Sequence, residues 1–160
     1  GGYAAARRGR GRRVPAGGTT PTMDQKLALL AKVPLLAGMD RKDLEHVGRL
    51  CEEVDIVAGK VVARQGDRAT EFFVIIDGQV RVDRDGEHLR DMGPGDFFGE
   101  LAMLGNIPRT ATVTTTTPCR FLVLGSREFN SLLHDHPGIQ HAVLHAVAQR
   151  VASLEPHLPH

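Results

Sequence analysis

The sequence predicts a mainly β fold with flanking helices: an antiparallel β jelly-roll barrel with an N-terminal helical segment and two C-terminal helices. Short runs rich in Val, Leu and Ile fill residues 51–125 and follow the period of strands. Asp77-Gly78 and Asp85-Gly86 separate such runs, and this dipeptide is the strongest short-range hairpin signal. Residues 24–50 and 126–154 instead repeat their apolar residues at helical spacing. Many short antiparallel strands with frequent turns favour a sandwich or a jelly roll.

The helical segments carry start and stop signals. We expect Asp24 to cap the first helix and Asp40 to cap the next one, because a short side-chain oxygen there can accept the unpaired N–H groups. Pro137 separates the two C-terminal helices. The last helix has one apolar face, formed by Ile139, Val143, Val147, Val151 and Leu154. We therefore predict one domain over residues 24–155 and a short tail over residues 156–160.

Residues 1–23 differ in composition from the rest of the chain. They contain five of the 20 basic residues, all arginine, and none of the 19 acidic residues, so residues 24–160 hold 15 basic and 19 acidic residues and a formal charge of −4. The segment is rich in Gly and Arg and lacks hydrophobic periodicity, so we expect a disordered basic tail. A linker, a vector-derived leader and a weak contact for nucleic acid or an acidic membrane all fit it. No other nucleic-acid contact is expected.

Several classes of protein are disfavoured by what the sequence lacks. No apolar stretch is long enough to span a bilayer, and no apolar segment follows the N-terminal arginines as it would in a signal peptide. Cys51 and Cys119 fit no metal or redox spacing, so we interpret them as buried, reduced thiols. Reduced thiols are typical of the cytoplasm, which is the expected location.

The eight histidines raise the question of a metal enzyme. His134 and His136 flank an aspartate, as in metal phosphohydrolases, but they lie at the end of a predicted helix. A cupin-type site needs His and Glu ligands clustered on strands, and only His88 falls on a predicted strand. No nucleophile lies beside a base and an orienting group. We therefore expect a binding module with no catalytic residues, no metal and no cofactor.

Residues 98–113, FGELAMLGNIPRTATV, combine the features of an anion-binding site. Gly99 allows the backbone to approach a ligand closely, and the residues after it can form a short helix. The first N–H groups of such a helix are unpaired and lie at the positive end of its dipole. Arg109 can add charge-assisted bonds to the same anion, and Glu100 can accept a hydroxyl group. A phosphate joined to a sugar hydroxyl describes a nucleotide.

The same segment resembles the phosphate-binding cassette of cyclic nucleotide-binding domains, as in catabolite activator proteins, kinase regulatory subunits and cyclic-nucleotide-gated channels. Upstream, RQGDRATEFFVIIDGQVRV resembles the strand–Gly-Asp–strand–Gly–strand signature of that family, with Gly66, Asp67 and Gly78 in the expected places. The resemblance covers Val33 to Leu154. Two long patterns in the expected order make it specific.

The resemblance implies a role for each matching residue. Glu100 would bind the ribose 2′-hydroxyl, and Arg109 would neutralise the cyclic phosphate. Thr110 would bond the phosphate or the 2-amino group of guanine, which leaves the choice between cAMP and cGMP open. The other expected ligand-binding residues are Gly99, Leu101 and Ala102 through their backbone, Ala111 beside Thr110, and Val82 and Met92 in the base pocket.

In this family the last helix closes over the base as a lid. Counting without gaps from Arg109 places a lid arginine at Arg150, for which an exposed helix position is an equal alternative, and Leu154 lies one turn later. The sequence thus predicts a non-enzymatic regulatory domain, with cAMP favoured over cGMP, in which the ligand bridges the cassette and the lid helix to switch an unidentified effector domain or partner. A degenerate domain of the same fold, acting as a protein-interaction module without nucleotide, is the alternative. Both a stand-alone sensor and a fragment of a larger receptor fit the chain.

Overall fold

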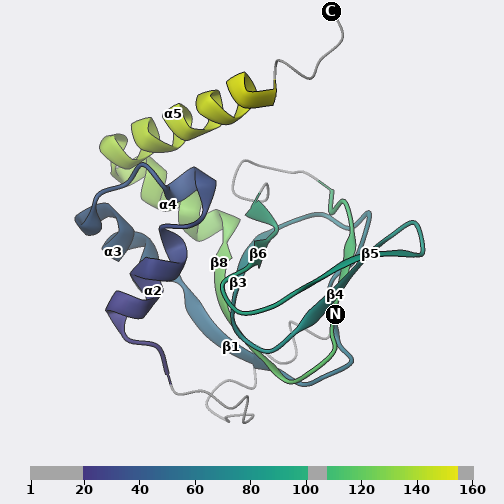
Figure 1. The fold of residues 1–160 in the computed structure, drawn as a ribbon. Helices are drawn as coiled ribbons and strands as arrows, with labels where there is room; N and C mark the ends of the chain where they lie inside the picture. Colours follow the sequence, from purple (N-terminus) through teal and green to yellow (C-terminus); the bar gives the residue numbers. More distant parts are fainter. Residues whose placement is uncertain (1–19, 101–107, 155–160) are drawn as a thin grey trace, which may run out of the picture. The chain divides into compact units, whose positions relative to one another are not determined.

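The computed structural model describes residues 20–100 and 108–154, with side chains described up to residue 149 (Figure 1). Two compact units emerge from it, which we call the sheet unit (residues 51–127) and the helical unit (residues 21–50 and 128–154). The predicted cassette helix over residues 101–107 and both predicted tails fall outside the described residues.

The sheet unit consists of two four-stranded sheets whose paired strands are all antiparallel. The first sheet, in order, contains β1 (Glu52–Ile56), β8 (Cys119–Gly125), β3 (Glu71–Asp77) and β6 (Phe97–Phe98). The second contains β2 (Val61–Ala63), β7 (Thr112–Thr115), β4 (Val80–Arg84) and β5 (Glu87–Met92). This arrangement confirms the predicted jelly-roll class. No ladder joins the two sheets among the described strands, so the expected barrel is open; strands as short as β2 and β6 offer few groups for further pairing.

Both sheets contribute side chains to one apolar core. Phe73 and Phe121 enter it from the first sheet, and Val80 and Val82 enter it from the second. The ring of Phe73 stacks on Phe98 with the centroids 4.7 Å apart, and it meets Phe121 edge-on at 5.6 Å. The core therefore extends to the end of β6, where the predicted site begins.

Both predicted hairpin turns are present. Gly78 has a φ of +97°, and a Cβ there would overlap the backbone of Pro118 and Cys119, so this turn requires glycine. Asp85 and Gly86 have φ values of +54° and +80°, as a type I′ turn requires.

The helical unit takes in most of α4 (Ser126–Asp135) and all of α2 (Met23–Leu30), η1 (Pro34–Leu36), α3 (Arg41–Leu50) and α5 (Pro137–Leu154). Helix α5 packs against η1, and its residues Ile139 and Val143 are buried, as the predicted apolar face requires. Asp40 caps α3 as predicted, since its carboxylate accepts the Asp43 N–H at 2.9 Å. Within the described residues, no helix has both the length and the apolar character to cross a membrane.

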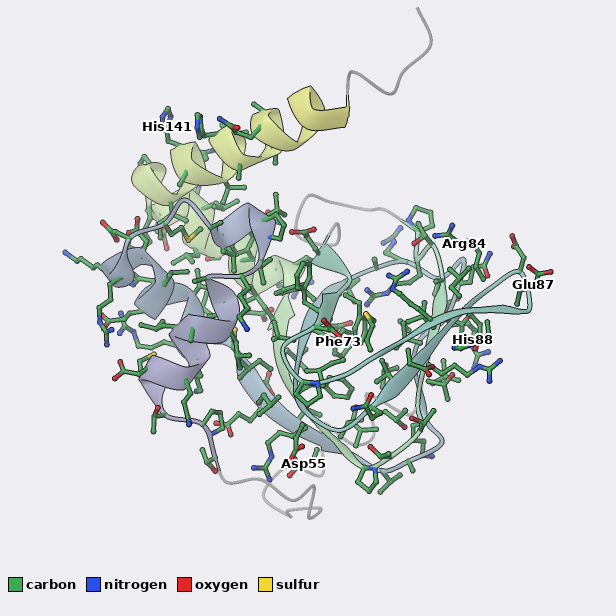
Figure 2. All side chains as sticks on the ribbon, viewed as in Figure 1. Asp55, Phe73, Arg84, Glu87, His88 and His141 are labelled. Atoms are coloured by element: carbon green, nitrogen blue, oxygen red, sulfur yellow. The ribbon has the colours of Figure 1, made fainter. Side chains whose placement is uncertain are left out.

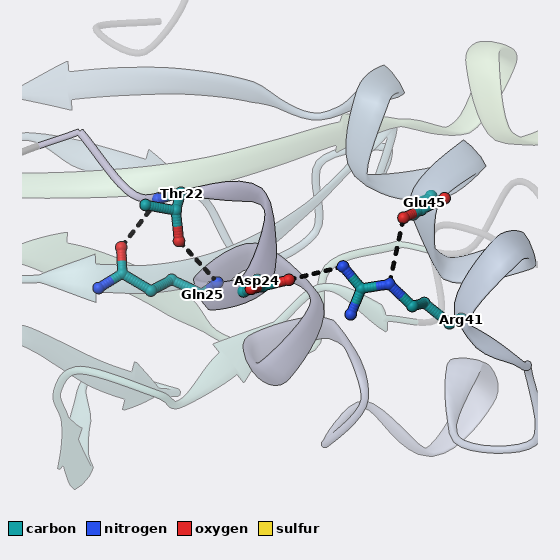
Figure 3. Close-up of polar contacts among 5 residues, drawn as sticks. All are labelled: Thr22, Asp24, Gln25, Arg41 and Glu45. Carbon is teal, nitrogen blue, oxygen red and sulfur yellow. Dashed lines mark hydrogen bonds and ion pairs between the residues drawn. The ribbon is translucent and has the colours of Figure 1, made fainter.

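The expected cap of the first helix at Asp24 is wrong. Thr22 is the N-cap, because its hydroxyl accepts the Gln25 N–H while the Gln25 side chain accepts the Thr22 N–H (Figure 3). Asp24 lies within the first turn and accepts a hydrogen bond from Arg41 at 2.6 Å. Arg41 also donates to Glu45 one turn along its own helix. The complete capping box satisfies the backbone N–H groups of Thr22 and Gln25. A helix that began after Asp24 would lack this pair of hydrogen bonds.

Candidate functional site

The predicted phosphate-binding segment begins where β6 ends. Gly99 has a φ of +80°, which lies in the left-handed region that favours glycine. A Cβ at this position would also overlap the guanidinium of Arg109 and the carbonyl oxygen of Glu71. Glu100 follows and is only 6% exposed. The backbone at Gly99 thus lies directly against the guanidinium of Arg109, within the segment predicted to bind the ligand.

The loop between β2 and β3 holds the backbone of Arg109. The Arg109 N–H donates to the carbonyl of Asp67 at 2.8 Å, and the Gly66 N–H donates to the carbonyl of Arg109 at 2.9 Å. Next to this pair, Pro108 and Arg68 form an isolated β-bridge. The two patterns that carry the family resemblance, far apart in the sequence, therefore meet at Arg109.

The side chain of Arg109 is buried in the sheet unit and is 8% exposed. Its Cζ lies 5.7 Å from the ring centroid of Phe73, which gives a cation–π contact. Figure 2 shows Phe73 in the interior of the sheet unit. Nη2 of Arg109 lies 4.0 Å from Oε1 of Glu71, which is close enough for charge attraction but too far for a hydrogen bond. The Thr70 hydroxyl donates to the same Oε1 at 2.8 Å, so the carboxylate is held in place.

A second buried arginine provides a comparison within the same unit. Arg120 is 2% exposed and donates from Nε to Oδ1 of Asp55 at 2.7 Å. This hydrogen bond raises the pKa of the Arg120 guanidinium, although burial opposes the change. The pair joins β8 to β1 through direct hydrogen bonding and has a structural role. The ion pair of Arg109 with Glu71 is longer, with 4.0 Å between Nη2 and Oε1.

The remaining predicted residues of the sheet unit lie in two settings. Val82 and Met92 are buried in the core, and Ala111 is half-buried and packs against it. Thr110 is exposed, and its carbonyl accepts a hydrogen bond from Nε of Arg84 at 3.1 Å. Figure 2 labels Arg84, the last residue of β4, ahead of the β4–β5 hairpin. The contacts of these residues with a base stay a prediction.

Four predicted residues have side chains outside the described part of the chain. Leu101 and Ala102 fall within residues 101–107. Arg150 and Leu154 belong to α5, of which the backbone is described at these positions. Their expected contacts with a nucleotide therefore remain predictions.

Sequence reasoning missed Glu71 and Arg84. Glu71 is an acid at the start of β3, whose interior is apolar and whose last residue is again an acid, Asp77. An acid at a strand end does not by itself distinguish a site residue from a solvated strand end. Arg84 directly precedes a predicted turn, where a charged residue is ordinary. Their relation to Arg109 and Thr110 depends on strand pairing, which no local pattern reveals.

The described residues contain no group of three or more His, Cys, Asp or Glu side chains that could hold a metal ion. His88 is exposed at the β4–β5 hairpin, where its Nε2 lies 2.8 Å from Oδ1 of Asp91 (Figure 2). His141 is exposed on α5. Among the described residues, the groups that remain as candidates for ligand binding are the buried guanidinium of Arg109, the carboxylates of Glu71 and Glu100, and the turn at Gly99.

Comparison with known proteins agrees with the geometry. A family model described as cyclic nucleotide-binding domain matches residues 53–136. The chain is 35% identical over 111 residues to a cAMP-dependent protein kinase regulatory subunit of Blastocladiella emersonii, a match that covers 66% of this chain and 28% of that protein. The chain thus spans under a third of the length of that relative.

Two solved structures share the fold. The N-terminal domain of a transcriptional regulator from Streptomyces coelicolor superposes with a TM-score of 0.75 and 30% identity, covering 81% of this chain and 94% of that one. The regulatory domain of Toxoplasma gondii PKA, solved with cAMP, superposes with a TM-score of 0.64 and 33% identity, covering 73% of this chain and 46% of that one.

Proposed function

Because this chain belongs to the cyclic nucleotide-binding domain family, we propose that it is a regulatory domain that binds cAMP in preference to cGMP. The observation that carries the proposal is Arg109, a buried arginine with its backbone held by two hydrogen bonds and its guanidinium against Gly99. A buried cation whose backbone is already held loses less freedom when it receives an anion, which favours binding.

In this proposal each end of the ligand has its own charged partner. Arg109 neutralises the cyclic phosphate, with the backbone of Gly99, Leu101 and Ala102 adding hydrogen bonds. Glu100 accepts the ribose 2′-hydroxyl, which a buried carboxylate can do at short distance. The base lies near the remaining predicted residues of the sheet unit, which are Val82, Met92, Thr110 and Ala111.

We further propose that the nucleotide acts as a switch. Arg150 and Leu154 would contact the base, so that α5 moves from a loose to a docked state when ligand binds. A kinase regulatory subunit and a transcriptional regulator are both similar to this chain, which supports a module that serves different effectors. The effector here stays unidentified. The domain would act in the cytoplasm, with no metal, no cofactor and no catalysis.

Isothermal titration calorimetry with cAMP and cGMP tests the proposal. We expect binding of both, with cAMP the tighter. Chromatography of the recovered nucleotide should return it unchanged, and a product peak would instead support hydrolysis. If neither nucleotide binds at sub-millimolar concentration, the domain is the protein-interaction module named as the alternative. Amide exchange of residues 137–154, with and without cAMP, tests the switch, since docking should slow exchange there.

A further inference from the structure

The carboxylate of Glu71 has no place in the roles assigned above, although it lies within 4.0 Å of the arginine that would hold the phosphate. Its side chain is 21% exposed, and the Thr70 hydroxyl fixes the oxygen that faces Arg109. Glu100, which is buried, follows the glycine that touches the same guanidinium. Of these two acids, Glu100 has a ligand hydroxyl to bind in the proposed function, whereas Glu71 has no assigned partner on the ligand.

We propose that Glu71 is a specificity-determining residue that makes this site select phosphate groups by charge. It favours a phosphodiester with one negative charge and rejects phosphomonoesters, such as 5′-AMP, which carry close to two. The inference rests on the proposed nucleotide site, and it concerns the class of ligand that this site refuses.

The physical reason lies in the count of charges around the phosphate. The single charge of a cyclic phosphodiester is matched by Arg109. A phosphomonoester carries about −1.5 to −2 at pH 7, so a second charge would remain near Glu71. Two further arginines lie next to this segment: Nε of Arg84 donates to the Thr110 carbonyl, and Arg68 forms the β-bridge with Pro108. Both are exposed, so solvent screens their charges. Discrimination then comes from repulsion of the wrong ligand rather than from added attraction for the right one.

The test replaces Glu71 by glutamine, which keeps the size of the side chain and an oxygen to accept the Thr70 hydroxyl. Glu87→Gln is the matched control, because it removes the same charge at the exposed tip of the β4–β5 hairpin (Figure 2). Each protein is titrated with cAMP, with 5′-AMP and with adenosine 5′-methylphosphate. The last ligand has an open phosphate but only one negative charge, so it separates charge from ring closure.

We expect Glu71→Gln to raise the affinity for cAMP and for adenosine 5′-methylphosphate about threefold, and the affinity for 5′-AMP about tenfold, since a second charge roughly doubles the repulsion that is removed. In wild type, adenosine 5′-methylphosphate should bind more tightly than 5′-AMP. Glu87→Gln should shift all three affinities equally and by less than twofold.

Equal gains for all three ligands in Glu71→Gln would overturn the inference, and so would no change. A loss of affinity for all three would assign Glu71 to the positioning of Arg109 instead. The wild-type comparison of 5′-AMP with its methyl ester decides the matter even if the variant folds poorly, because equal affinities would exclude selection by charge. Failure of wild type to bind cAMP would be a different result, since it would reject the proposed function itself.

Discussion

The guanidinium of Arg109 occupies the space that a side chain at position 99 would need. Gly99 is therefore required twice, once for its φ of +80° and once for the room it leaves to the arginine. The glycine and the arginine of the predicted cassette act as one packed unit. Their relation leads directly to the first prediction.

Replacing Gly99 by alanine should lower both the stability of the domain and its affinity for nucleotide. A left-handed alanine costs about 1–2 kcal/mol, and the overlap with Arg109 and Glu71 must be relieved by moving the arginine. We expect the free energy of unfolding, measured in urea, to fall by about 2–4 kcal/mol in total. Gly59→Ala is the matched control, since Gly59 has a φ of +81° with nothing within 4 Å of the added Cβ. Equal losses in the two variants would show that packing against Arg109 has no role.

Replacing Arg109 by alanine should remove most of the affinity for cyclic nucleotide. The phosphate would then be buried without its counter-charge, which costs about 2–5 kcal/mol when one member of a buried charge pair is removed. Calorimetry with cAMP measures the change. Arg81→Ala serves as the control, because Arg81 is exposed and pairs with Asp83 on its own strand. A loss of less than about tenfold, or 1.4 kcal/mol, would show that Arg109 is not the phosphate ligand.

Replacing Thr110 by alanine should lower the affinity for cGMP more than that for cAMP. The hydroxyl of Thr110 is exposed on the segment that follows Arg109, where it can bond the 2-amino group of a guanine. One such hydrogen bond contributes about 0.5–1.5 kcal/mol, so the affinity for cGMP should fall about two- to tenfold. Competition of both nucleotides for one labelled ligand measures the two changes together. Equal losses would assign the hydroxyl to the phosphate, and Thr110 would then have no part in the choice of base.

The buried thiol of Cys119 should make the domain less stable in alkali. Burial raises the pKa of this thiol above its ordinary value of 9.0, despite hydrogen bonds that oppose the shift. Its contribution to stability is complete below pH 9 and declines as the pH rises through that value toward the raised one, by up to about 1.4 kcal/mol per pH unit. Urea unfolding of wild type and of Cys119→Ala, in reductant at pH 7 and pH 10, measures this contribution.

At pH 7 the alanine variant should be the less stable of the two, because a buried sulfur is lost. The difference in unfolding free energy should narrow by pH 10, since only wild type loses stability through the thiol. Other titrating groups are shared by both proteins and cancel in the difference. A constant gap between pH 7 and pH 10 would show that the thiol of Cys119 does not titrate differently in the folded state.

Much of the fold follows from the sequence because it depends on local chemistry. Asp85-Gly86 forms its turn because few other dipeptides tolerate two positive φ values. The error at Asp24 is also local: two capping residues lie close together, and the one with a glutamine three positions later completes the box. Competition between neighbouring signals limits the placement of helix ends more than it limits the detection of helices.

The candidate site was predictable only in part. Gly99, Glu100 and Arg109 lie in one short segment, so its motif names them together. The hydrogen bonds between Arg109 and the loop of Gly66 and Asp67, one donated from each side, depend on how distant segments pair. The same holds for Glu71, because its closeness to Arg109 in space cannot be predicted from their separation in the sequence. These contacts depend on pairing between segments that are distant in the sequence, and this pairing is visible only in the folded chain.

The two hydrogen bonds that join Arg109 to the loop of Gly66 and Asp67 have a use in protein engineering. They use only backbone groups, and they hold Arg109 from a different part of the chain. Side-chain replacements at Thr110 and Ala111 leave both bonds available, because neither residue takes part in them. Libraries at these two positions would therefore vary the preference for the base while the backbone anchor of Arg109 is kept, which makes the domain a scaffold for nucleotide biosensors.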